Sequence, residues 1–160
     1  MELLAETSEI PDTGTQTPAS NTALAFEGVH FAYPSRPTHP ALSDFTLEIA
    51  HGESVALVGP SGAGKSTVFE LMLRFYDPIA GAIRFGGADL REMSLDRWRQ
   101  KIALVPQQPT LFSGDIFYNI AYGAYEPTQA AVEAAAQMAH AHEFIQTLPE
   151  GYQSHLGAQG

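Results

Sequence analysis

The chain has 160 residues, a length that suits one domain with a sizeable hydrophobic core. Its net charge is −10, and all eight lysines and arginines lie between Arg36 and Lys101. The basic stripe of a nucleic-acid-binding protein is missing, so we expect no nucleic-acid partner. The absence of cysteine excludes disulfides, thiolate metal sites and cysteine catalysis, and no apolar run reaches the 18 residues of a membrane span.

The chain begins with a segment whose composition is typical of a linker. Residues 7–22 are rich in Ser, Thr, Pro and Gly and contain one large apolar residue. Such a segment has little apolar surface with which to stabilise a fold. We therefore expect a flexible linker over 1–22 and a folded part over 23–160.

Three strands are predicted next. Apolar and polar residues alternate from about residue 24 to Pro34 and again over 43–50, which predicts two strands with one buried face each. His51 and Gly52 mark a turn after the second strand. Residues 55–58 are continuously apolar, which predicts a strand that is buried on both faces.

Helices and strands then alternate along the chain. Apolar residues at Val68, Leu71, Met72 and Phe75 predict an amphipathic helix over 65–75. A short strand or hairpin is expected over 81–87, a helix capped by Ser94 over 94–101, and a second buried strand over 102–106. A loop over 107–124 and an alanine-rich helix over 127–149, capped by Thr128, complete the pattern. This order of elements indicates an α/β or α+β domain.

One motif carries chemistry. Residues 59–66, Gly-Pro-Ser-Gly-Ala-Gly-Lys-Ser, match the phosphate-binding pattern G-x-x-x-x-G-K-[ST] between the predicted strand and the helix. Glycines let successive N–H groups point into one concavity, and the helix adds the partial positive charge of its N-terminus. Lys65 is expected to reach the β- and γ-phosphates, and the Ser66 hydroxyl to ligate Mg²⁺. The predicted nucleotide contacts are Gly59, Pro60, Ser61, Gly62, Ala63, Gly64, Lys65, Ser66 and Thr67.

The phosphate-binding motif alone does not separate ATPases, GTPases and small-molecule kinases. Two further stretches do, "VHFAYPSRP" at 29–37 and "IALVPQQPTLFSGDIFYNIAYG" at 102–123. With them the sequence closely resembles the nucleotide-binding domain of exporter-type ABC transporters, over roughly 24–160. The resemblance implies that Tyr33 stacks on the adenine ring. It also implies that Gln107, rather than its neighbour Gln108, reaches Mg²⁺ and the attacking water.

The same resemblance implies a fold, cofactors and partners. The fold is that of a P-loop NTPase, with an antiparallel β-subdomain and the start of a helical subdomain. The cofactors are ATP and Mg²⁺. The partners are the transmembrane domain of the same transporter, contacted through the loop after Gln107, and a second nucleotide-binding domain. The expected location is the cytoplasmic face of the membrane, where the intact protein would couple ATP hydrolysis to export.

Three features of the ABC family do not occur in this sequence. They are an apolar strand ending in Asp-Glu, the "LSGGQ" signature and a later histidine, which together complete the hydrolytic site. We therefore expect residues 23–160 to be the N-terminal portion of the domain, truncated before the signature. The sheet would be incomplete, with 55–58 exposed and unpaired. This portion is expected to bind ATP without hydrolysing it, which leaves its status as an enzyme open.

Two other functions stay open at this point. One is a non-transport ABC-type ATPase, such as a DNA-repair protein, and the other is a nucleotide-binding regulatory module. His140 and His142 are not expected to form a metal site, because residues two apart on a helix point to different faces.

Overall fold

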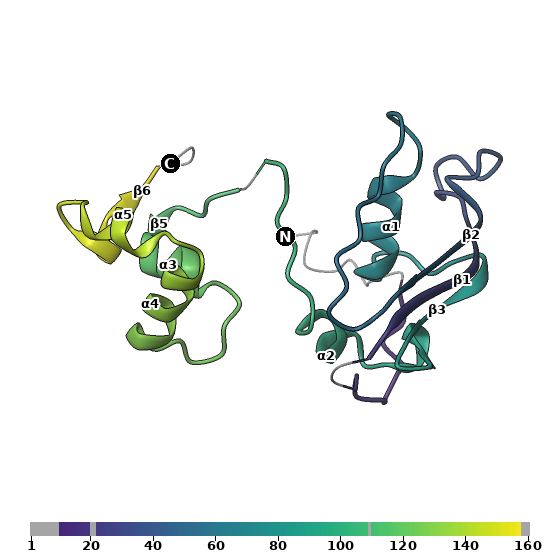
Figure 1. The fold of residues 1–160 in the computed structure, drawn as a ribbon, viewed down its shortest axis with the longest axis horizontal. Helices are drawn as coiled ribbons and strands as arrows, with labels where there is room; N and C mark the ends of the chain where they lie inside the picture. The colour runs from purple at the N-terminus through teal and green to yellow at the C-terminus, as the bar shows by residue number, and fades with distance from the viewer. Residues whose placement is uncertain (1–9, 20–21, 109, 158–160) are drawn as a thin grey trace, which may run out of the picture. The chain divides into compact units, whose positions relative to one another are not determined.

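The structure is a computed structural model that describes residues 10–19, 22–108 and 110–157. It divides into two compact units, residues 1–104 and 105–160, which Figure 1 shows as the purple-to-teal and the green-to-yellow parts of the chain. Each unit has its own hydrophobic core. The two units are described separately below.

An antiparallel sheet forms the frame of the first unit. Its strands are β1 (Leu24–Phe31), β2 (Leu42–Ile49), β3 (Ala80–Phe85) and β4 (Ala88–Asp89), in the order β2-β1-β3-β4. β3 and β4 are joined by Gly86 and Gly87, whose positive φ angles of 60° and 83° suit a tight hairpin turn. The mixed α/β fold with an antiparallel β-subdomain is thus confirmed.

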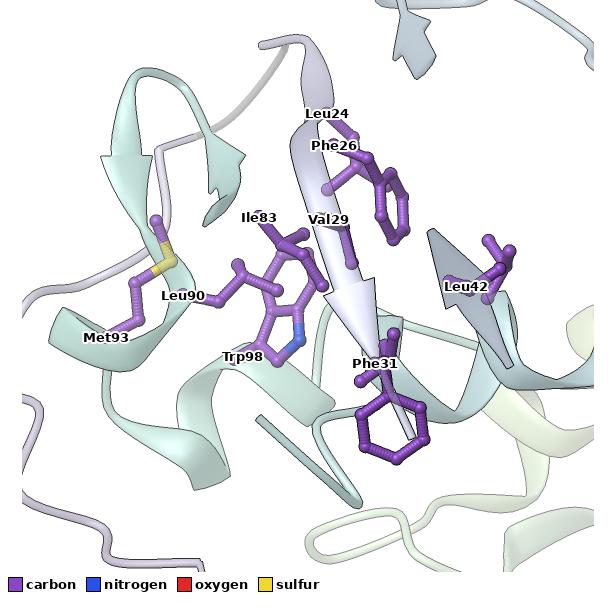
Figure 2. Close-up of a cluster of buried hydrophobic side chains, with 11 residues drawn as sticks. Leu24, Phe26, Val29, Phe31, Leu42, Ile83, Leu90, Met93 and Trp98 are labelled. Carbon is purple, nitrogen blue, oxygen red and sulfur yellow. The ribbon is translucent and has the colours of Figure 1, made fainter. Parts of the chain in front are cut away.

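Two helices and one 3₁₀ turn pack against this sheet. They are α1 (Lys65–Met72), the 3₁₀ turn η1 (Leu90–Glu92) and α2 (Leu95–Arg99). Figure 1 shows α1 beside the strands, and its buried residues Val68 and Leu71 join the core. Figure 2 shows Ile83, Leu90 and Trp98 gathered next to β1 in that core. α1 therefore begins at the end of the phosphate-binding motif and is held in place by the sheet.

The two strands that the sequence predicts to be buried on both faces are absent. Residues 55–58 and 102–106 form no strand, and Val58 and Val105 are 89% and 91% exposed. The physical reason is that a strand buried on both faces needs neighbouring strands to pair with, and the described strands β2, β1, β3 and β4 pair only with one another. The prediction of buried strands was wrong. The expectation that 55–58 would be unpaired is confirmed, and these residues are exposed except for Leu57, which packs half-buried against the core.

Part of the segment predicted as a linker contacts a later part of the first unit. Asp12 Oδ1 accepts a hydrogen bond from Leu95 N at 2.8 Å, and Gln16 exchanges backbone hydrogen bonds with Glu92 and Ser94 at 3.1 Å. Ser94 occupies the N-cap position of α2 as predicted, but its side chain makes no capping bond. Asp12 instead satisfies the first N–H group of α2. This contact ties the described residues 10–19 to the η1–α2 region.

The second unit is mostly helical. It contains β5 (Gly114–Asp115), α3 (Ile116–Ala121), α4 (Gln129–Met138), α5 (His142–Gln146), the 3₁₀ turn η2 (Gly151–Gln153) and β6 (His155–Leu156). Its core is made by Ile116, Ala121, Val132, Ala136, Ile145 and Tyr152.

Two sequence predictions change within this unit. The segment 107–124 is not simply a loop, because it contains α3, whose first turn is capped by Asp115 Oδ1 accepting from Tyr118 N. The predicted helix over 127–149 is two helices, because His140 adopts a left-handed φ of 55° between them. Thr128 does cap the first of the two, accepting from Ala131 N at 3.2 Å. None of the described helices is long and apolar enough to cross a membrane.

Candidate functional site

The glycine-rich loop before α1 has a backbone conformation that favours glycine at two positions. Gly62 and Gly64 have φ angles of 81° and 82°, in the left-handed region. A Cβ atom at Gly64 would lie 2.6 Å from the carbonyl oxygen of Ala41 and 2.8 Å from Leu42 Cδ2. The loop is therefore pressed against the start of β2, and glycine at 64 is required by both conformation and space.

Hydrogen-bond donors gather where this loop meets α1. The N-cap residue Gly64 has no side chain to cap the helix, which leaves the N–H groups of the first turn to a ligand. Lys65 begins the helix, and its Nζ donates to the carbonyl oxygens of Gly59 and Pro60, both at 2.7 Å. The Lys65 ammonium group thus lies against the glycine-rich loop. Together with the N-terminus of α1, its positive charge favours the binding of anions in this region.

A hollow of about 390 Å³ lies next to the loop. It is lined by Tyr33, Arg36, His39, Ala41, Ser61, Gly62, Gly64, Lys65, Ser66 and Thr67. Two basic side chains, Arg36 and Lys65, and no carboxylate are among these residues, although the whole chain carries a net charge of −10. The lining therefore favours a negatively charged ligand.

Tyr33 forms the aromatic part of this lining, two residues after the end of β1. Its ring packs edge-on against Phe31 and Tyr76, with centroids 5.0 and 5.5 Å apart. Its hydroxyl makes 2.8 Å hydrogen bonds with Thr67 Oγ1 and Glu70 Oε2 on α1. Burial raises the pKa of the Tyr33 phenol and the neighbouring Glu70 carboxylate raises it further, against the opposing effect of the Thr67 hydrogen bond. The phenol therefore keeps its proton at neutral pH.

Most of the predicted site residues share this region. Tyr33, Ser61, Gly62, Gly64, Lys65, Ser66 and Thr67 line the hollow. Gly59 and Pro60 contact the Lys65 ammonium, and Ala63 N donates to Pro60 O at 3.2 Å within the loop. Gln107 is exposed and belongs to the second unit. What each of these residues does toward a ligand stays a prediction.

Three residues of the region were not predicted from the sequence. Arg36 and His39 follow Tyr33 in "YPSRPTH" and line the hollow, and Glu70 holds the Tyr33 hydroxyl. A signal for Glu70 existed in its spacing, because residues three apart on a helix share a face, here Thr67 and Glu70. No comparable signal existed for His39, because residues in a loop have no regular spacing that predicts which side chains lie together.

The hollow fits a nucleotide in its chemistry. The lining offers free backbone N–H groups, an ammonium, a hydroxyl on Ser66 for a hard cation and an aromatic side chain for a base. This combination of glycine-rich loop and helix start defines the class of P-loop nucleotide-binding proteins.

Comparison with known proteins then gives the family. A family model described as "ABC transporter" matches residues 42–157. The chain belongs to the ABC transporter family. It is 50% identical over 137 residues to "ABC transporter B family member 19" of Arabidopsis thaliana, covering 86% of this chain and 11% of that protein. It is 47% identical over 148 residues to "ABC multidrug transporter mdr4" of Aspergillus fumigatus, covering 89% of this chain and 11% of that protein.

A solved structure agrees with these sequence relatives. A bacterial Atm1-family ABC exporter has a TM-score of 0.86 and 37% sequence identity to this chain, covering 99% of this chain and 28% of the exporter chain. The prediction that the chain is the ATP-binding part of an exporter-type ABC protein is supported by both comparisons. The chain spans only about a tenth of the length of the curated relatives that it matches.

Proposed function

We propose that the first unit binds Mg-ATP, with the triphosphate along residues 59–67 and the adenine ring against Tyr33. The observation that carries this proposal is the hollow that Tyr33 shares with Gly62 and Lys65. It brings an aromatic ring from the end of β1 next to the phosphate-binding loop, although 32 positions separate Tyr33 from Lys65 in the sequence. The similar bacterial exporter was solved with ATP bound, which supports ATP as the nucleotide.

Lys65 and Ser66 would bind the phosphate end. The Lys65 ammonium has three donors, of which two contact the carbonyl oxygens of Gly59 and Pro60. The third donor is available to a phosphate oxygen without rearrangement of the loop. Ser66, which is exposed in the first turn of α1, would ligate the metal through its hydroxyl. Bound Mg²⁺ would neutralise charge on the phosphate oxygens.

Gln107 is proposed to reach the metal and the attacking water, and the loop after it to meet a transmembrane domain. Support for the second role comes from an apolar surface in the second unit. Phe112 and Tyr122 stack with centroids 4.0 Å apart, and both are exposed. Exposed aromatic pairs are typical of surfaces that bind another protein.

The remaining proposals concern the whole protein. We propose that it pairs two nucleotide-binding domains, lies at the cytoplasmic face of a membrane and couples ATP hydrolysis to export. The support is the names of the relatives, which are ABC transporters and multidrug transporters. For the 160-residue chain itself we propose binding without turnover. Phosphate release by the chain above the level of a Lys65→Ala variant would contradict this.

The test of nucleotide binding is calorimetric titration of the full 160-residue chain with Mg-ATP. Lys65→Ala removes the ammonium, and we expect at least a tenfold loss of affinity, which corresponds to about 1.4 kcal/mol. Tyr33→Ala removes the stacking surface, which is worth about 1–3 kcal/mol per base. Lys101→Ala is the matched control, because it removes an exposed lysine from another part of the first unit.

The outcomes separate clearly. Binding that weakens in both site variants and not in Lys101→Ala supports the proposal. Binding that is equally strong in wild type and Lys65→Ala would place the nucleotide elsewhere and contradict it.

A further inference from the structure

The Tyr33 hydroxyl is held by two side chains of α1. Its phenol has one proton, and the short contact to the Glu70 carboxylate, 2.8 Å from Oε2, uses it as a donor. The Thr67 hydroxyl, also at 2.8 Å, then donates to the phenol oxygen. Thr67 is buried, so its position is fixed by the core, whereas Glu70 is half-buried. Glu70 is the charged partner and makes the stronger type of bond.

These contacts restrict the ring in a specific way. Phe31 and Tyr76 pack edge-on against the Tyr33 ring and limit its translation. Rotation of the side chain away from the hollow would carry the hydroxyl off α1 and break both of its hydrogen bonds. The bond to Glu70 therefore favours the one orientation in which the ring lines the hollow.

We propose that Glu70 is a positioning residue that sets the orientation of the Tyr33 ring relative to the phosphate-binding loop, an inference that rests on the proposed binding of ATP. Glu70 contacts the tyrosine and is not among the residues that line the hollow. It lies on α1, the helix that begins at Lys65. One helix therefore carries both the groups that would donate hydrogen bonds to phosphate and the carboxylate that holds the Tyr33 hydroxyl. The distance between the two ends of the binding site is thereby fixed before the nucleotide arrives.

This arrangement predicts a selective effect. A ligand that uses both ends of the site depends on the orientation of Tyr33, whereas a ligand without a base does not. Loss of Glu70 should therefore weaken ATP binding and leave the binding of inorganic tripolyphosphate unchanged. General damage to α1 would weaken both ligands, because the helix also carries Lys65.

The experiment uses the full 160-residue chain, titrated with Mg-ATP and separately with Mg-tripolyphosphate. For Glu70→Ala we expect about a five- to tenfold loss of ATP affinity, the effect of one charge-assisted hydrogen bond, and less than about a twofold change for tripolyphosphate. Glu70→Gln keeps an acceptor for the phenol and should restore most of the ATP affinity. Glu27→Ala, which removes an exposed carboxylate paired with Arg84, is the matched control.

A double-mutant cycle isolates the contact. Tyr33→Phe keeps the ring and removes the hydroxyl, so it should mimic Glu70→Ala, and combining the two substitutions should add no further loss. If Glu70→Ala does not fold, Tyr33→Phe and Glu70→Gln carry the same test. Equal losses for both ligands, or no loss of ATP affinity in Tyr33→Phe and Glu70→Ala, would overturn the inference. A wild-type chain that binds neither ligand would instead overturn the proposed function.

Discussion

Arg74 Nε donates a hydrogen bond to Asp77 Oδ1 at 2.9 Å, and the arginine side chain is only 2% exposed. Arg74 follows α1 in a left-handed conformation, with φ of 54°, and it also donates to the carbonyl oxygens of Leu90 and Pro11, both at 3.3 Å. One buried guanidinium thus joins the end of the phosphate-binding helix to η1 and to the N-terminal segment. A buried charge of this kind is costly to leave without its partners.

Replacement of Arg74 should therefore destabilise the first unit. Arg74→Met keeps the length of the side chain and removes every donor, and we expect a loss of at least about 2 kcal/mol in the free energy of unfolding. Urea titration followed by fluorescence measures this, because Trp98 is the single tryptophan and is buried in the same core. Arg84→Met, which breaks an exposed ion pair with Glu27, should cost under about 1 kcal/mol. Equal costs for the two variants would show that the buried network contributes nothing.

Gly64→Ala should be far more damaging than Gly52→Ala. Both glycines have left-handed φ angles, 82° and 77°, so both variants incur conformational strain of about 1–2 kcal/mol. Only at Gly64 would the new Cβ meet the carbonyl oxygen of Ala41, because nothing lies within 4 Å of the corresponding position at Gly52. We expect Gly64→Ala to cost at least about 3 kcal/mol in total, measured by thermal or urea unfolding. Similar stability of the two variants would mean that the loop can move away from β2.

Acid should weaken the first unit through Asp89. Burial alone would raise the pKa of this carboxyl, but hydrogen bonds from Arg91, one of them 2.6 Å long, lower it overall. A carboxyl with a lowered pKa in the folded state stabilises the fold above its ordinary pKa of 3.8, and this contribution is lost as the pH falls through the lower, folded value. The stability difference between wild type and Asp89→Asn should therefore shrink as the pH falls below about 3.8.

Arg91→Met provides the check on the cause of this pH dependence. Without the guanidinium, the carboxyl of Asp89 loses its main stabilising partner, so most of the acid-dependent part of the stability should disappear. A wild-type profile and an Arg91→Met profile of the same shape would assign the acid sensitivity to other groups.

The exposed apolar segment 55–58 should promote association and not stability. Val58 is 89% exposed, so Val58→Ser should change the free energy of unfolding by less than about 0.5 kcal/mol. Val29, which is completely buried in β1, should lose at least about 2 kcal/mol on the same substitution. Sedimentation velocity at several concentrations should show less self-association for Val58→Ser than for wild type. Unchanged association would show that the segment is not a contact surface.

The sequence correctly predicted those structural elements that depend only on residues close together in the chain. The alternation of Phe45, Leu47 and Ile49 places these residues on one half-buried face of β2, as expected. The phosphate-binding pattern correctly predicted that a helix begins at Lys65. Each of these signals is contained within a few residues, where spacing and side-chain type decide the outcome.

The features that were not predicted depend on distant partners. An apolar run such as 102–106 becomes a strand only when another strand offers it hydrogen bonds, and its composition says nothing about whether one does. The link between Tyr33 and Glu70 spans 37 positions, and no spacing rule connects the end of a strand to the middle of a later helix. One residue of the candidate site that was not predicted from the sequence is therefore Glu70, which holds Tyr33 in place.

The cap that Asp12 gives to α2 has a consequence for the order in which the chain folds. The two partners, Asp12 and Leu95, are 83 residues apart, and a five-residue helix is too short to persist alone in water. During synthesis at roughly 5–20 residues per second, Asp12 leaves the ribosome about 4–17 seconds before Leu95. Throughout that interval its carboxylate has no helix to cap. The segment around Asp12 can dock only after η1 and α2 have emerged, so it waits for partners that are made 83 positions later.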